Sequence, residues 1–176
     1  FPLSPANFRD WRDGQKSFEA MALVDPGAFT LRSGDPASGP GGAEPERLLG
    51  ARVSGNLFQL LGARLEAGRG FTAEEDAPGA PPVAVISHAL WQRRFGADRA
   101  LVGRTVELNG RPTTVVGVLP ADFRFAAADR ADVYAPLGWG EEQWRPRGSH
   151  WLTAVARLKP GVSPRAAQAD LQVIAD

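Results

Sequence analysis

TVELNGRPTTVVGVLP, residues 105–120, carries the clearest local signal for the fold of this chain. Runs rich in β-branched residues flank Asn109-Gly110, a pair that readily adopts the positive φ angles required by a type I′ turn. The stretch therefore predicts a β-hairpin. The composition indicates a folded, turn-rich domain, because 20 glycines and 15 prolines accompany 43% hydrophobic residues in a chain of 176.

Strands and helices are expected on both sides of this hairpin. The apolar run 83–86 predicts a buried strand, and Ser87 predicts the start of a helix that ends at Gly96. Further strands are predicted at 132–137 and at 151–158, where apolar residues alternate along the chain. These elements together favour the α+β class.

The two ends of the chain share one pattern. Ser4-Pro5 and Ser163-Pro164 each predict a first helical turn, since serine caps the helix and proline lacks an N–H that would be unpaired there. The chain opens with a predicted helix and hairpin and closes with a predicted strand and helix. The predicted division is one subdomain from 1–64 with 150–176, and a second, mixed α+β subdomain inserted at 65–149.

Four local features complete the expected elements. Residues 18–33 predict a hairpin that turns at Asp25-Pro26-Gly27. Residues 34–45 hold no apolar side chain larger than alanine and predict a surface loop. A short helix is expected at 57–62, and Thr72 with Glu75 predicts a capping box.

The composition excludes several classes of function. The absence of cysteine excludes disulfide scaffolds, iron–sulfur clusters, thiol nucleophiles and thiolate-bound zinc. The 20 Lys and Arg residues balance 20 Asp and Glu residues, which argues against nucleic acid as a partner. No stretch approaches the ~20 apolar residues of a membrane-spanning helix. We expect a soluble segment cut from a longer protein.

No catalytic, cofactor-binding or metal-binding residue is predicted. Ser87 and His88 are neighbours in sequence, whereas a nucleophile and its base must meet through space, and His150 has no carboxylate near it in the sequence. The acidic groups at 74–76 and 141–142 do not face each other across a cleft as glycosidase carboxylates do. Acids in a first helical turn instead interact favourably with the helix dipole.

Trp139 and Trp144 are the candidate residues for contact with a partner. They lie in a connection rich in glycine, proline and charged residues. An aromatic side chain in such a segment either covers the edge of the core or anchors a partner. The residues that determine specificity for a partner are expected in the loops at 34–45 and 138–149.

Ordered blocks of sequence resemble the MacB-like periplasmic core domain of ABC transporter permeases of the MacB, FtsX and LolCE type. These blocks are VSGNLF (53–58), GRGFTAEED (68–76), VISHALWQRRFG (85–96) and VGRTVELNG (102–110). FRDWR (8–12) and RLKPGVS (157–163) are similar to a subgroup of large duplicated permeases. The resemblance thus extends over nearly the whole chain.

The resemblance implies a non-enzymatic periplasmic domain of an inner-membrane permease, built of a porter-like βαβ-type subdomain with a second subdomain inserted. It implies coupling of ATP-driven helix movement to cargo or adaptor handling, as in efflux, and no cofactor. The implied partners are the permease's own membrane helices, a second permease subunit, indirectly a cytoplasmic ATP-binding subunit, and an adaptor or a peptide or lipoprotein cargo. Two alternatives stay open: a secreted hydrolase or carbohydrate-binding module using the Trp-rich region 138–151, and a free-standing adaptor domain.

Overall fold

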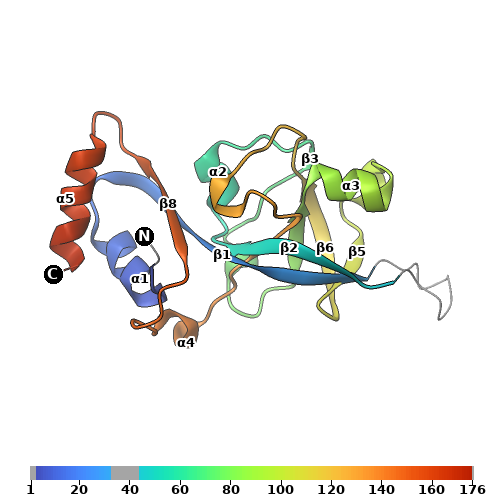
Figure 1. Cartoon of the computed structure of the whole chain (residues 1–176), viewed down its shortest axis with the longest axis horizontal. Helices are drawn as coiled ribbons and strands as arrows, with labels where there is room; N and C mark the ends of the chain where they lie inside the picture. Colours follow the sequence, from blue (N-terminus) through green and yellow to red (C-terminus); the bar gives the residue numbers. More distant parts are fainter. Residues whose placement is uncertain (1–2, 33–43, 176) are drawn as a thin grey trace.

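The computed structural model describes residues 3–32 and 44–175, which form two lobes joined by one long strand and by a second segment that returns to the first lobe (Figure 1). The terminal lobe, residues 3–24 and 138–175, carries both ends of the described chain. The barrel lobe comprises residues 25–32 and 44–137. The predicted loop at 34–45 lies outside the described residues except for its last two positions.

Six strands of the barrel lobe pair in a closed ring. They are β1 (Phe18–Arg32), β2 (Glu46–Val53), β4 (Val83–Ile86), β5 (Thr105–Leu108), β6 (Arg111–Val118) and β7 (Val133–Pro136). The order around the ring is β1, β2, β7, β4, β6, β5 and back to β1. The pairs β2–β7 and β4–β6 are parallel and the others antiparallel. The short strand β3 (Ala67–Gly68) also pairs with β6. This mixed sheet confirms the predicted α+β class.

One apolar cluster fills the ring. Every ring strand contributes to it, through Phe29, Leu31, Leu48, Ala84, Ile86, Leu108, Val115, Val118, Val133 and Ala135. Helix α3 (His88–Phe95) adds Leu90 and Trp91 to the same cluster and so covers one mouth of the ring. Ser87 caps this helix and Gly96 ends it with a φ of 58°, as predicted.

A second cluster lies on the outer face of the ring, under helix α2 (Leu57–Leu61) and the segment that follows β6. Its centre is Phe58, whose ring lies 5.5 Å from the rings of both Phe71 and Tyr134. Three single-turn helices complete the lobe: η2 (Glu74–Asp76), η3 (Arg99–Leu101) and η4 (Ala126–Ala128).

The terminal lobe contains α1 (Pro5–Gly14), α4 (Glu141–Trp144), β8 (Thr153–Leu158) and α5 (Pro164–Ala175). The first half of β1 pairs with β8, and both helix starts predicted at Ser-Pro pairs are confirmed. Ser4 Oγ accepts the N–H of Asn7 at 3.3 Å, and Ser163 Oγ accepts the N–H of Ala166 at 3.2 Å. The third apolar cluster, which includes Phe8, lies inside this lobe.

The hairpin predicted at Asn109-Gly110 is confirmed. Both residues have positive φ angles, 51° and 73°, and Leu108 pairs directly with Arg111. The tip also closes the ring, because Asn109 Oδ1 accepts the N–H of Thr30 in β1 at 2.8 Å.

The hairpin predicted over residues 18–33 is wrong. β1 passes through Asp25-Pro26-Gly27 as one strand of 15 residues. Its residues 18–24 pair with β8, and residues 24–31 pair with β2. Partners far away in the sequence therefore override the local turn signal.

The register explains how Pro26 fits inside this strand. The N–H of Ser54 donates to the carbonyl of Leu23 at 3.0 Å, so the odd-numbered residues of this part of β1 form the hydrogen-bonded pairs with β2. Pro26 lies between two of these hydrogen-bonded pairs, so its nitrogen is directed away from β2. On that side, β8 has no residue paired with Pro26. Proline is tolerated at such a position because no ladder hydrogen bond is lost.

The predicted division at 64/65 and 149/150 stays a prediction. β2 and α2, which it places with the chain ends, pack with β4, β6 and β7 of the predicted insert. The two ends of the described chain do lie together, since α1 contacts α5. The packing therefore favours boundaries at 24/25 and 137/138.

Candidate functional site

The carboxylate of Asp76 links the two lobes at the point where the chain returns to the terminal lobe. Its Oδ2 accepts the N–H of Gly55 at 2.7 Å, and its Oδ1 accepts the N–H of Gly138 at 3.0 Å. Gly55 follows β2, and Gly138 is the first residue of the segment that returns to the terminal lobe. We call this pair of hydrogen bonds the Asp76 clamp. Hydrogen bonds to an ionised acceptor are stronger than neutral ones, so the clamp ties the crossing at 137/138 firmly to the end of β2.

A capping box positions the η2 turn that carries Asp76. The N–H of Thr72 donates to Glu75 Oε2 at 2.9 Å, and the N–H of Glu75 donates to Thr72 Oγ1 at 3.3 Å, as predicted. Arg69 pairs with both oxygens of Glu75, at 2.7 and 2.9 Å. This pairing lowers the pKa of the Glu75 carboxyl below its usual value. The turn is therefore held by its own side chains, independently of Asp76.

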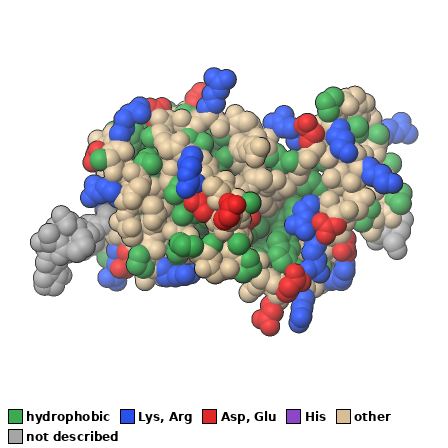
Figure 2. Space-filling view, turned by 180° about the vertical axis from the view of Figure 1, so that it is seen from behind, with side chains coloured by type: hydrophobic (Ala, Val, Ile, Leu, Met, Phe, Trp, Pro, Cys, Tyr) green, Lys and Arg blue, Asp and Glu red, His purple; other side chains and the backbone are tan. Residues whose placement is uncertain are grey.

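A cleft of about 360 Å³ opens between the lobes beside the clamp. The terminal lobe lines it with Phe8, Arg12 and Trp144, and the barrel lobe lines it with Gln59, Phe71 and Asp76. In the space-filling view, apolar side chains are visible in the hollow between the two lobes (Figure 2).

Trp139 and Trp144, the predicted partner-contact residues, lie at the edge of the terminal lobe's core. Their rings meet edge to face with centroids 5.0 Å apart, and Trp144 stacks on Phe8 at 6.3 Å. The guanidinium carbon of Arg12 lies 5.7 Å from the centroid of the Trp144 ring. Both tryptophans are half-buried, so they cover the core. Their contact with a partner stays a prediction.

Ser87 and His88 do not form a catalytic relay. Ser87 Oγ caps α3 and donates to Asp132 Oδ1 at 2.5 Å. The His88 ring lies edge to face with Trp91, and its buried Nδ1 has no hydrogen-bond partner among the described residues. His150 is exposed in the connection before β8. Within residues 3–32 and 44–175, no group of three or more histidine or acidic side chains could hold a metal ion.

The acidic pair at 141–142 lies in the first turn of α4, as the sequence indicates. Glu141 accepts a hydrogen bond from Arg9 of α1 at 3.0 Å. This ion pair is exposed, so it contributes little to stability but connects α4 to α1.

The family of the chain follows from its sequence over nearly the whole length. The family described as the MacB-like periplasmic core domain matches residues 3–174. This chain is a MacB-like periplasmic core domain. A relative described as a probable export ATP-binding/permease protein of Pseudomonas fluorescens (strain Pf0-1) is 30% identical over 111 residues. That alignment covers 62% of this domain and 17% of the relative, so the domain spans a small part of that protein.

Solved structures of low sequence identity share the fold of this MacB-like domain. The periplasmic region of MacB from Actinobacillus actinomycetemcomitans matches with a TM-score of 0.69 at 17% identity, covering 99% of this chain and 74% of that structure. The extracellular domain of the noncanonic ABC-type transporter YknZ from Gram-positive bacteria matches with a TM-score of 0.64 at 16% identity, covering 100% and 83%. In the described part of the chain, no helix combines the length and hydropathy needed to cross a membrane.

The role of Asp76 in this MacB-like domain is not evident from the sequence. By sequence, Asp76 is one of the acids of a first helical turn, next to the residues of the capping box. The two partners of its carboxylate lie 21 and 62 residues away. No local pattern reports such distant backbone donors.

Proposed function

We propose that this domain couples ATP-driven movement of permease membrane helices to the handling of a periplasmic cargo or adaptor. The observation that carries the proposal is the packing of α1 against α5, which brings both ends of the described chain to one end of the molecule (Figure 1). A Cβ placed on Gly14 would lie 3.3 Å from Ile174 Cδ1, so the two helices are in close contact. A body attached in this way moves with neighbouring membrane helices.

The continuous strand β1 supports transmission of this movement from one lobe to the other. Its first half belongs to the terminal lobe through β8, and its second half belongs to the ring through β2. The hydrogen bond from Gly138 to Asp76 adds a second connection. We propose that the cleft between the lobes widens or narrows as the membrane helices move, with subdomain boundaries at 24/25 and 137/138.

The proposed partners meet the terminal lobe. Val173 of α5 is 79% exposed, which is unusual for an apolar side chain of its size in this domain. We propose that α5 and the edge formed by Trp139 and Trp144 face the permease's own helices or a second permease subunit. The domain itself is proposed to be non-enzymatic, with ATP hydrolysis carried out by a separate ATP-binding unit.

Cross-linking the cleft in the full-length permease tests this proposal. Arg12 and Gln59 line opposite walls of the cleft, and this domain contains no cysteine, so R12C and Q59C introduce two defined thiols into a permease whose cysteines outside the domain have been replaced. A short, reducible bis-maleimide should lower the ATP hydrolysis rate of the reconstituted permease, and reduction should restore it. The two single-cysteine variants, treated identically, should keep their rates. An unchanged rate after complete cross-linking would show that hydrolysis does not require movement between the lobes.

A further inference from the structure

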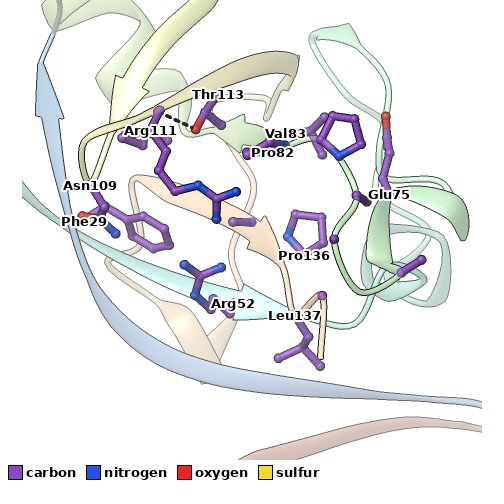
Figure 3. Close-up of a pocket in the computed structure, with 17 residues that line it drawn as sticks. Phe29, Arg52, Glu75, Pro82, Val83, Asn109, Arg111, Thr113, Pro136 and Leu137 are labelled. Atoms are coloured by element: carbon purple, nitrogen blue, oxygen red, sulfur yellow. Dashed lines mark hydrogen bonds between the residues drawn. The ribbon is translucent and has the colours of Figure 1, made fainter. Parts of the chain in front are cut away.

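The mouth of the ring opposite α3 holds two arginines whose side chains point toward each other (Figure 3). Arg52 lies near the end of β2, and Arg111 begins β6. Side chains alternate along a strand, so Arg52 faces the same way as the core residue Leu48, and Arg111 the same way as the core residue Val115. On its strand, each arginine is therefore the side chain nearest the mouth among those that face the inside of the ring.

The two arginines share a pocket of about 160 Å³. Its other walls include apolar and stiff side chains, namely Phe29, Pro82, Pro136 and Leu137 (Figure 3). The guanidinium carbon of Arg52 lies 5.7 Å from the centroid of the Phe29 ring. The mouth of a β-barrel is a common location for ligand sites, with a few polar groups set in an apolar wall.

The charges in this pocket are not balanced by ion pairs. Among the described residues, neither arginine has a carboxylate within salt-bridge distance. Asp25 is opposite Arg52 in the ladder, and its carboxyl interacts with the Arg52 charge without forming an ion pair. Burial raises the pKa of Asp25, while the hydrogen bond that its Oδ1 accepts from Trp151 Nε1 at 3.1 Å and the charge of Arg52 lower it. Glu75 also lines the pocket, and both its oxygens are held by Arg69.

We infer that this mouth binds a carboxylate group of a polypeptide. A guanidinium presents a planar fork of N–H donors that matches the two oxygens of a carboxylate. Two such forks in one pocket repel each other, and an entering anion removes that repulsion. The apolar walls suit the short aliphatic stem of an acidic side chain or the last residue of a peptide. This inference goes beyond the proposed function, because it requires no transport.

An NMR titration of the 176-residue chain tests the inference. The probes are the capped peptide acetyl-Gly-Asp-Gly-amide, the peptide acetyl-Gly-Gly-Gly with a free carboxylate, inorganic phosphate, and the neutral acetyl-Gly-Asn-Gly-amide. At least one carboxylate peptide should cause saturable shifts of the Arg52 and Arg111 Nε–H signals, and the neutral peptide should not. Binding of the aspartate peptide would identify the ligand as an acidic side chain. Binding of the peptide with a free carboxylate would identify it as a chain end.

Arginine variants assign the binding to the pocket. R52Q and R111Q should each weaken binding by about tenfold or more, the usual effect of losing a charge-assisted hydrogen bond. R64Q removes an equal charge from an exposed arginine outside the pocket and should bind as the unmodified chain does. R52K and R111K keep the positive charge but lose the forked N–H donors, so they should bind with intermediate strength. They also test the inference if a glutamine variant does not fold.

Four results would overturn the inference. One is the absence of saturable shifts with either carboxylate peptide. A second is binding of phosphate alone, which would assign the pocket to a different anion. A third is equal weakening by R64Q and R52Q, which would indicate a general charge effect. The fourth is unchanged binding in both R52K and R111K, since that would leave no role for the forked donors.

Discussion

The Asp76 carboxylate accepts the backbone N–H of Gly138 at 3.0 Å, so a side chain of the barrel lobe holds the first residue of the segment returning to the terminal lobe. The same carboxylate accepts the N–H of Gly55. One half-buried side chain thus ties the end of β2 to the start of the segment that returns to the terminal lobe. This contact lies beside the cleft between the lobes.

Replacing Asp76 should therefore destabilise the domain. Asp76→Ala removes two charge-assisted hydrogen bonds and should lower the free energy of unfolding by about 2–3 kcal/mol, measured by urea denaturation. Asp76→Asn keeps one carbonyl acceptor and should cost about half as much. Asp122→Ala removes an exposed carboxylate in the same lobe and should have little effect. Equal losses for the alanine variants at 76 and 122 would show that the clamp does not hold the lobes.

The facing glycines Gly27 and Gly50 should respond very differently to alanine. A Cβ on Gly50 would lie 2.5 Å from both Phe29 Cδ2 and the Val133 carbonyl oxygen, whereas a Cβ on Gly27 meets nothing within 4 Å. Gly50→Ala should cost about 3 kcal/mol or prevent folding, because the backbone atom cannot move aside. Gly27→Ala should be neutral or stabilising by about 0.5 kcal/mol. Chemical denaturation measures the stability of the two variants. Similar denaturation midpoints would contradict the close packing around Gly50 inside the ring.

Tyr134 gives the domain a defined response to alkaline pH. Burial, followed by the charges of Asp129 and Asp132, raises the pKa of Tyr134 from 10.0 to about 12. Its contribution to stability is complete below pH 10 and is lost as the pH rises toward 12, because only the unfolded chain ionises there. The loss approaches about 1.4 kcal/mol per pH unit. Tyr134→Phe should remove this part of the pH dependence.

The titration of Tyr134 can be observed directly, because it is the only tyrosine in the sequence. Tyrosinate absorbance at 295 nm should appear near pH 12 in the folded chain and near pH 10 in concentrated urea. A midpoint near pH 10 without urea would show that the hydroxyl, which donates to the Ala128 carbonyl at 3.2 Å, is accessible to solvent.

Asn109 serves the hairpin in two separable ways. Its backbone has a φ of 51°, and its side chain accepts the N–H of Thr30 at 2.8 Å. Asn109→Ala loses the acceptor and keeps the strained backbone, so it should cost about 2 kcal/mol. Asn109→Gly loses only the acceptor and should cost about 1 kcal/mol or less. Thermal unfolding of both variants gives the comparison, and an alanine variant as stable as the glycine variant would contradict the account.

Elements with a local signal were predictable from the sequence. The Asn109-Gly110 turn, the cap at Ser87 and the left-handed end at Gly96 each depend on residues within one turn of the chain. The buried strand at 83–86 was equally clear, since all four residues are apolar and buried. Such features follow from backbone conformational preference and burial alone.

Features that depend on distant pairing were not predictable. Asp25-Pro26-Gly27 has the composition of a turn, yet β2 and β8 hold it in an extended strand. The closed ring requires pairing of β1 with both β2 and β5, and no local pattern reports that. The same limit applies to Arg52 and Arg111, which are 59 positions apart in the sequence and meet only because the ring brings β2 and β6 to one mouth.

The central claim, that the two lobes move relative to each other with the ATP cycle, is tested most directly by a distance measurement in the full-length permease. Spin labels on Gln92 of α3 and Gln168 of α5, both exposed, report on opposite lobes. Double electron–electron resonance should give different distance distributions in the nucleotide-free and ATP-vanadate-trapped states. Superimposable distributions in a permease that hydrolyses ATP would contradict the account.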